Sequence, residues 1–351
     1  MAAAADAPRA ATPDDAAKWH GYLLKDEGLP LPDCVTRSSL LARPKCATGV
    51  LASEFADGPA VLERKAAALL RQWRAAERPL VYAGAGISTS SGIRDYASQA
   101  AGSKVQPAQA ALTMPFIRAL QPTPAHRVLT AMEKRGLVWG WLQQNHDGLA
   151  QKAGFPASKV NELHGSWLDQ TKNPIIKMSG SLRGDLFDWM LQMEQQCDFV
   201  FAVGTSFSGL NADRCAATCA ARHRRGAGHG LAVVSVQQTP MDAVAAVRVF
   251  ARIDDFMLVV ARQLGVPTPL PAAIHAYAAA PLPVGPPAAD AWRAERAAKR
   301  EAYAVEGRAA AVRATGAGAA TPAAVAATAK SAAAIANASS RSPLPPVAKR
   351  Q

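Results

Sequence analysis

The chain has 351 residues and a formal net charge of +12, and 49% of its residues are hydrophobic. This length allows one large domain with tails, or two domains, and the composition supplies enough apolar residues for a core. There is no apolar run of transmembrane length and no secretory leader pattern, and the five cysteines form no C-x-x-C pair. These features argue against a membrane protein and against a disulfide-stapled secreted domain, and they predict a soluble protein of the nucleus or cytoplasm.

Residues 1–57 are predicted to form an N-terminal extension, of which 1–17 is predicted to be disordered. The rest of the extension is interrupted by prolines, and its scattered apolar residues suggest a segment that lies over a domain. A helix is predicted from Pro59 to about Glu77, because proline suits the first helical turn and apolar residues recur at helical spacing.

The first predicted strand, residues 80–83, runs directly into Gly84-Ala85-Gly86. Glycines allow a sharp turn and a close approach of the backbone to a ligand. A helix after this turn would direct its N–H groups at a phosphate. However, Thr89 occupies the third glycine position of G-x-G-x-x-G. The turn alone therefore leaves two alternatives open, a dinucleotide site and a βα turn without a ligand.

Further along the chain, residues 97–122 are predicted to form a mobile loop with a short helix that closes over a ligand. Thr123 is predicted to cap a helix that ends near Gly136. The other predicted elements are a strand at 137–142, an apolar turn at 160–163, a strand at 174–178, a helix at 183–195, a strand at 199–203, a helix at 211–223, a strand at 231–236 and a segment capped by Thr239 that ends in a helix at 254–264.

This alternation of strands and helices predicts an α/β fold with a Rossmann-like, doubly wound parallel sheet. In such sheets a ligand binds outside the carboxyl ends of the strands. Turns of small or polar residues at Gly84, Gln144 and Gly204 each follow a predicted strand. We therefore expect these three turns to meet at one binding site.

Residues 266–351 are predicted to form a tail that is largely disordered, with a proline-rich linker first and low-complexity sequence last. Within it, residues 289–314 are compatible with an exposed charged helix. The tail holds ten Lys/Arg and four Asp/Glu, a net charge of about +6. A basic tail suggests an acidic partner such as nucleic acid, but the interpretation we prefer is a solvated extension. No membrane partner is predicted.

Six short motifs follow one another along the chain: G-A-G-I-S at 84–88, G-I-x-D at 92–95, P-T-x-x-H at 122–126, Q-N-x-D-G-L at 144–149, H-G at 164–165 and G-T-S at 204–206. This series resembles the sirtuins, the NAD-dependent protein deacylases, over about residues 58–265. The resemblance implies a catalytic domain over that range, NAD as cofactor, and an acyl-lysine protein, such as a histone, as substrate.

The resemblance also implies the roles of individual residues. His164 would be the base that takes a proton from a ribose hydroxyl, after the acyl oxygen has attacked the ribose carbon that releases nicotinamide. Its alternative is a core histidine satisfied by a hydrogen bond. Asn145 would orient the ribose hydroxyls or a water, and Gln144 would line the ribose site. The other implied NAD contacts are Gly84, Ala85, Gly86 and Ser88 at the phosphates, Asp95 and Asp147 at nicotinamide, and Gly204, Thr205, Ser206 and Ser235 at phosphate and adenosine ribose.

The sequence departs from the sirtuin pattern in the zinc module. No cysteine occurs between His164 and Cys197, so the usual site of four thiolates is predicted to be absent and the small domain to be reduced. Cys215, Cys219 and His223 could share one helix face, but a metal site there would need a fourth ligand. We interpret these residues as packing residues and predict no metal.

Other departures lie near the NAD motifs. Ala97 replaces an arginine that helps to hold NAD in the family, and Arg94 is a candidate substitute. His146 replaces an apolar residue of the nicotinamide pocket, Ser235 replaces an asparagine, and Ser181 stands where a glutamate is expected. Two alternatives to deacylation therefore stay open. One is ADP-ribosyl transfer or NAD hydrolysis on the same fold. The other is a catalytically weak NAD-binding module with a role in chromatin or in regulation.

Overall fold

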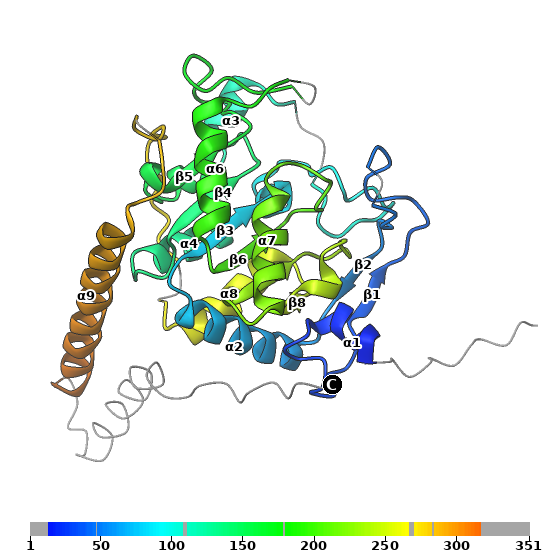
Figure 1. Cartoon of the computed structure of the whole chain (residues 1–351), viewed down its shortest axis with the longest axis horizontal. Helices are drawn as coiled ribbons and strands as arrows, with labels where there is room; N and C mark the ends of the chain where they lie inside the picture. Colours follow the sequence, from blue (N-terminus) through cyan, green and yellow to red (C-terminus); the bar gives the residue numbers. More distant parts are fainter. Residues whose placement is uncertain are drawn as a thin grey trace, which may run out of the picture. The chain divides into compact units, whose positions relative to one another are not determined.

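The computed structural model describes residues 13–46, 48–107, 111–177, 180–266, 270–282 and 284–316. The chain divides into two compact units, Met1–Trp292 and Arg293–Gln351. The first unit contains a two-stranded sheet and a six-stranded sheet (Figure 1).

The six-stranded sheet is parallel, with the strand order β5-β4-β3-β6-β7-β8. From β3 the chain builds outward through β4 and β5, and from β6 it builds in the opposite direction, so the order switches between β3 and β6. The α/β, doubly wound fold predicted from the sequence is confirmed. The strands are β3 (Pro79–Ala83), β4 (Gly140–Gln143), β5 (Val160–Glu162), β6 (Phe199–Val203), β7 (Gly230–Val234) and β8 (Val247–Val249).

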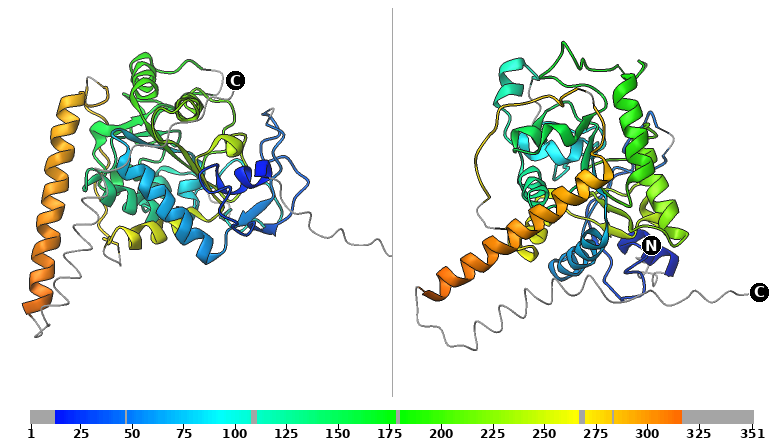
Figure 2. Two further views of the ribbon diagram at one scale, coloured as in Figure 1. Left: turned by 60° about the horizontal axis from the view of Figure 1, so that its bottom comes forward. Right: turned by 60° about the vertical axis from the view of Figure 1, so that its left-hand side comes forward.

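Helices cover both faces of this sheet (Figure 2). Successive strand residues point to opposite faces, so that Val81 and Ala83 join one core cluster and Leu80 and Tyr82 join the other. Both faces of the central strands are therefore buried, which is why β3, β6 and β7 are continuously apolar. The first cluster contains side chains of α2 (Pro59–Ala75), α4 (Pro124–Glu133) and α8 (Ile253–Gln263), and the second contains those of α6 (Gly184–Gln196) and α7 (Asp213–Arg224).

Several short elements complete the unit. Thr123 caps α4 as predicted, since its side chain accepts from the backbone N–H of His126. The loop at 97–122 contains one short helix in its described part. The short elements are α3 (Met114–Ala119), α5 (Leu149–Lys152) and the 3₁₀ helices η1 (Ala85–Ser91), η2 (Ala157–Lys159) and η3 (Asp242–Val244).

The described part of the N-terminal extension packs against the part of the first unit that contains the six-stranded sheet. It contains α1 (Pro13–His20) and an antiparallel pair, β1 (Asp33–Thr36) and β2 (Glu54–Ala56). Trp19 lies in this segment, and its ring centroid is 5.3 Å from that of Phe250, beyond the last strand. Disorder is predicted for residues 1–17, of which 1–12 lie outside the described residues and 13–17 belong to the helix α1.

Three sequence expectations are wrong about secondary structure. The apolar turn expected at 160–163 is the edge strand β5, which pairs with β4 from Trp141↔Val160 onward. No strand forms at 174–177, while Met178 lies outside the described residues. The segment after Thr239 contains the strand β8 before its helix. Both unpredicted strands have only three residues, too few to show a period of two.

The segment after Gly265 contacts the sheet unit where the structure describes it. The backbone N–H of His275 donates to the carbonyl of Lys152 at 2.8 Å, and Trp292 is buried, with its indole N–H donating to Glu77 O at 2.7 Å. The charged helix α9 spans Ala289–Gly316. Across the described ranges, no helix is both long enough and apolar enough to cross a membrane.

Candidate active site

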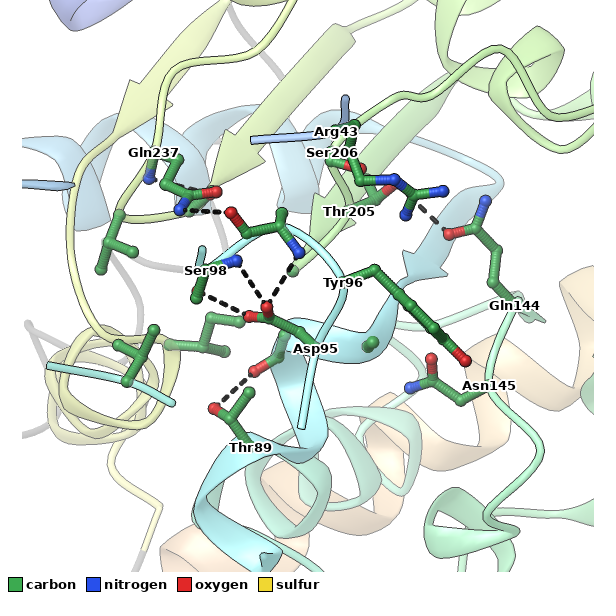
Figure 3. Close-up of a pocket in the computed structure, with 18 of the residues that line it drawn as sticks. Arg43, Thr89, Asp95, Tyr96, Ser98, Gln144, Asn145, Thr205, Ser206 and Gln237 are labelled. Carbon is green, nitrogen blue, oxygen red and sulfur yellow. Dashed lines mark hydrogen bonds between the residues drawn. The ribbon is translucent and has the colours of Figure 1, made fainter. Parts of the chain in front are cut away.

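A cavity of about 370 Å³ lies at the carboxyl ends of β3, β4, β6 and β7 (Figure 3). Its volume is typical of ligand pockets, and it lies beside the point where the strand order switches. The three predicted turns meet there, as expected. Of the predicted site residues, Gly84, Ser88 and Asp147 do not line the cavity, whereas Ala85, Gly86, Asp95, Gln144, Asn145, His164, Gly204, Thr205, Ser206 and Ser235 do.

Two glycine turns pack directly against each other to form one wall of this cavity. The N–H of Gly86 donates to the carbonyl of Gly204 at 2.9 Å. A Cβ atom on Gly86 would lie 2.7 Å from Gly204 Cα, and one on Gly84 would lie 2.6 Å from Gly204 O. Gly204 itself has φ +65°, which also favours glycine. Glycine is therefore required at all three positions for the turns to meet.

The helix expected after the first turn is not an α-helix but the 3₁₀ helix η1. Hydroxyl side chains bond its carbonyls, since Thr89 Oγ1 donates to Gly86 O at 3.1 Å and Ser91 Oγ donates to Ser88 O at 2.6 Å. Such local bonds compete with regular helical pairing. The element ends at Gly92 in the left-handed conformation, with φ +99°.

His164 and Asn145 enter the cavity from β5 and β4, the two strands on one side of the switch point. Asn145 is buried, and its Nδ2 donates to Gly84 O at 3.0 Å, so its amide is fixed against the first turn. The Nδ1 atom of His164 lies 3.3 Å from the carbonyl oxygen of Gln144. A neutral imidazole that donates through Nδ1 to this carbonyl presents Nε2 as a proton acceptor.

The protonation state of His164 is set mainly by its burial. Burial lowers the pKa of His164, and this outweighs the hydrogen bond to Gln144 O, which raises it. The neighbouring His146 lowers the pKa of His164 further. The imidazole of His164 is consequently neutral at physiological pH, as a general base requires.

Asp147 and Ser88 lie next to the cavity wall and bond to each other. Ser88 Oγ donates to Asp147 Oδ2 at 2.7 Å, and the N–H of Leu149 donates to Asp147 Oδ1 at 2.9 Å. Burial raises the pKa of Asp147, while these two hydrogen bonds oppose the rise. The carboxylate is thus held in place by the chain itself, and its contact with nicotinamide stays a prediction.

Gln144 belongs to a partly buried hydrogen-bond network. Its Nε2 donates to the hydroxyl of Tyr82 at 2.5 Å, and its Oε1 accepts from Thr205 Oγ1 at 3.4 Å. Tyr82 in turn donates to Asp213 at 2.6 Å. This network joins the second and third turns and fixes the side chain of Gln144.

The loop around Asp95 is held by the carboxylate of that residue. Asp95 accepts from the backbone N–H groups of Ala97 and Ser98 at 3.0 and 2.7 Å (Figure 3). The side chain of Gln237 donates to Ala97 O at 2.9 Å and ties this loop to the end of β7. Arg94, the suggested substitute for the missing arginine, is exposed and is not a lining residue.

Ser235 and Ser206 are also placed by local bonds. Ser235 Oγ accepts from the N–H of Gln237 at 3.2 Å, and Ser235 O accepts from the buried side chain of Arg248 at 3.0 Å. Ser206 Oγ lies 2.6 Å from Ser208 Oγ. Both serines line the cavity, while Ser181 is exposed and does not.

Sequence reasoning missed two groups of lining residues. Arg43, Lys45 and Cys46 come from the N-terminal extension, and Arg252, Ile253 and Asp254 come from the start of α8. The second group follows β8, so recognition of that strand would have placed it at the same edge of the sheet. No local signal links the first group to the site, because it lies about 40 residues before the first turn.

The described residues contain no cluster of three His, Cys, Asp or Glu side chains that could hold a metal ion. Cys215 and Cys219 are buried in the core, as the packing interpretation predicts. His223 Nδ1 lies 2.8 Å from Gly228 O. The segment after Gly165, where the sequence predicts that the zinc module is absent, is a closed turn, in which the N–H of Ser166 donates to Asn173 O at 2.9 Å.

Comparisons with known proteins identify relatives of this chain. A family model described as Sir2 family matches residues 104–172. The chain is 27% identical over 259 residues to the NAD-dependent protein deacetylase SRT1 of Arabidopsis thaliana, which covers 62% of this chain and 53% of that protein. It is 38% identical over 120 residues to SRT1 of Oryza sativa subsp. indica, covering 32% of this chain and 24% of that protein. The chain therefore spans about half the length of the Arabidopsis relative.

A shorter relative and a solved structure are similar over more of their own length. The NAD-dependent protein deacetylase of Sulfurisphaera tokodaii is 26% identical over 225 residues, covering 51% of this chain and 87% of that protein. A solved structure of Sir2 with the inhibitor EX-527, 2'-O-acetyl-ADP-ribose and deacetylated p53 peptide has a TM-score of 0.46 and 20% identity, covering 57% of this chain and 99% of that chain. The six motifs in order and the family match at residues 104–172 thus make this chain similar to the sirtuin (Sir2) family.

Proposed function

We propose that this chain is an NAD-dependent protein-lysine deacylase. The observation that carries the proposal is the presence of His164 and Asn145 in the same cavity as the two joined glycine turns. A general base and a fixed amide thus line the same cavity as the two glycine turns. Binding modules for nucleotides need the turns alone, so the additional pair favours catalysis.

The chemistry of the cavity residues supports NAD as the ligand. Ala85 and Gly86 of the first turn and Gly204, Thr205 and Ser206 of the third line the cavity, where they offer backbone and hydroxyl groups to a ligand. The polar side chains of Gln144 and Asn145 line the same cavity and can hydrogen-bond to ribose hydroxyls. When bound, NAD would supply the nicotinamide–ribose bond that is broken and the ADP-ribose that accepts the acyl group.

In this proposal the chain's own residues orient groups and move a proton. Nε2 of His164 takes a proton from a sugar hydroxyl, while its Nδ1 stays paired with Gln144 O. Asn145 cannot rotate freely, because Gly84 O and Ser88 Oγ accept from its Nδ2. Its remaining oxygen is therefore held in one orientation toward the reacting sugar or a water.

The proposal also covers the substrate class, the domain boundaries and the location of the protein. The substrate class is acyl-lysine in proteins, with histones as one candidate. The boundaries of the catalytic domain, 58–265, and the disorder of the terminal segments stay predictions, as do contact of the tail with nucleic acid and a nuclear or cytoplasmic location.

A product analysis tests the proposal. The full chain is incubated with NAD and a library of peptides that carry lysines with different acyl chains, and products are identified by mass spectrometry. We expect deacylated peptide, nicotinamide and O-acyl-ADP-ribose in equal amounts from the native chain and from His223→Gln, a control histidine outside the cavity. His164→Ala should form none of them.

Two results would contradict the proposal. Equal activity of the native chain and His164→Ala on every peptide would remove His164 from catalysis. Loss of NAD without deacylated peptide would instead indicate NAD hydrolysis, or ADP-ribosyl transfer if the peptide gains mass.

A further inference from the structure

A loop of the N-terminal extension reaches the NAD cavity from outside the six motifs. In residues 40–46 and 48–52, here called the 40–52 loop, the chain turns back on itself. The N–H of Ala42 donates to Val50 O, and that of Ala52 donates to Leu40 O, both at 2.8 Å. At its far end the loop carries Arg43, which lines the cavity.

The 40–52 loop approaches the Asp95 loop through small side chains. Ala42 and Ala52 are buried in one cluster with Ala100, and Val50 and Ala97 are partly buried against it. Ala97 is the position at which the sirtuin pattern has arginine. The small residue at 97 thus lies in the contact by which the 40–52 loop reaches the cavity.

The Arg43 guanidinium is a half-buried cation that contacts an aromatic ring. Its Cζ lies 5.4 Å from the ring centroid of Tyr96, a cation–π contact. Among the described residues, no hydrogen bond or ion pair engages this guanidinium. It attracts Asp213 electrostatically, but the oxygens of Asp213 accept from Tyr82 and from the N–H groups of residues 209 and 210.

Two other arginines near the cavity are differently placed. Arg252 Nη1 donates to Lys104 O at 3.0 Å, and its Nε lies 3.7 Å from Asp255. Arg94 is exposed and outside the cavity. In Figure 3, the Arg43 side chain extends into the cavity that Thr205 and Ser206 also line. Within the described ranges this partly desolvated cation has a ring contact but no hydrogen bond or ion pair, and such a cation favours an anionic ligand.

We propose that Arg43 binds the pyrophosphate of the dinucleotide. This inference rests on the proposed function, because NAD is the ligand that brings the anion. A guanidinium offers two parallel N–H donors that match phosphate oxygens. The cation lost at Ala97 is thus replaced from a segment more than 50 residues earlier in the chain, and the same alanine makes room for that segment.

The test is a binding measurement that does not depend on turnover. Isothermal titration calorimetry on the full chain compares ADP-ribose, NAD and adenosine, which has no phosphate. Arg43→Gln, which keeps a hydrogen-bonding side chain without charge, should weaken ADP-ribose and NAD by about tenfold or more and leave adenosine within about twofold. Arg94→Gln, the matched control in the Asp95 loop, should leave all three unchanged.

Salt gives a second readout of the same interaction. Binding of ADP-ribose to the native chain should weaken with rising salt, and Arg43→Gln should weaken less over the same range, because one screened charge pair is missing. Thermal melting of both ligand-free variants checks that each is folded.

Several outcomes would overturn the role of Arg43. These are unchanged ADP-ribose affinity in Arg43→Gln, an equal loss for adenosine, or an equal loss in Arg94→Gln. Failure of the proposed function has a different signature. If ADP-ribose binding depends on Arg43 but no peptide is deacylated, the deacylase proposal fails and the role of Arg43 stands. If the native chain binds neither NAD nor ADP-ribose, both fail.

Discussion

The hydroxyl of Tyr277 donates a hydrogen bond of 2.7 Å to Oε2 of Glu162, the last residue of the edge strand β5. Tyr277 also fills a notch at Gly148, where an added Cβ would lie 2.7 Å from its ring. Gly148 follows Asp147 in the motif that carries Asn145, and Glu162 precedes His164 by two residues. Tyr277, which follows helix α8 in the chain, thus contacts both the segment that carries Asn145 and the segment that carries His164.

Glu162 should make the stability of the fold depend on pH. Burial raises the pKa of Glu162 to about 7, against an ordinary value of 4.5. Between these values the folded chain binds the proton and the unfolded chain releases it, so this residue destabilises the fold as pH rises from 4.5 to 7. Compared with Glu162→Gln, the native chain should lose up to about 3 kcal/mol of unfolding free energy over this window. Urea unfolding at several pH values measures the difference, and parallel curves for the two proteins would contradict it.

Tyr277→Phe should weaken the same contact selectively. The hydrogen bond from Tyr277 lowers the pKa of Glu162, because it stabilises the charged carboxylate. Without the hydroxyl, we expect a loss of about 1 kcal/mol in unfolding free energy at pH 8 and a smaller loss at pH 5. The control is Tyr22→Phe, since the structure gives the hydroxyl of Tyr22 no hydrogen bond within the described ranges. Equal losses at both pH values would show that the hydroxyl of Tyr277 acts without Glu162.

The sequence predicts the three turns of the site well, but not the segments that come to it from elsewhere. Strands β3, β6 and β7 are apolar runs of five residues next to glycine, so local pattern alone reveals them. Strands β5 and β8 have three residues each at the sheet edges, where no period can be read. The approach of Arg43 depends on packing between alanines of two loops. Contacts of this kind leave no signal in the neighbouring sequence.

The acid limb of the pH–activity profile should report His164 and respond to His146. Because burial and His146 both lower the pKa of His164, kcat/KM should fall only below about pH 6.5. His146→Leu removes one lowering influence, so the pKa of His164 should rise and the limb should move to higher pH. Imidazole NMR titration of the ligand-free chain measures the same shift without turnover. His223→Gln should leave both unchanged, and a limb that moves to lower pH in His146→Leu would contradict the assignment.

Gly204→Ala should abolish dinucleotide binding, because an added Cβ has nowhere to go at this turn. The Cβ would lie 2.5 Å from Ile87 N and 2.7 Å from Gly86 Cα, and the residue has φ +65°. Gly209→Ala is the matched control, since its φ is +84° but no atom lies within 4 Å of the added Cβ. Left-handed backbone alone costs about 1 kcal/mol, so Gly209→Ala should lose about that much unfolding free energy and bind ADP-ribose normally. Gly204→Ala should lose more, by about 1–3 kcal/mol, because the two turns must separate. Equal stability and equal ADP-ribose affinity in the two variants would show that contact between the turns is not needed for binding.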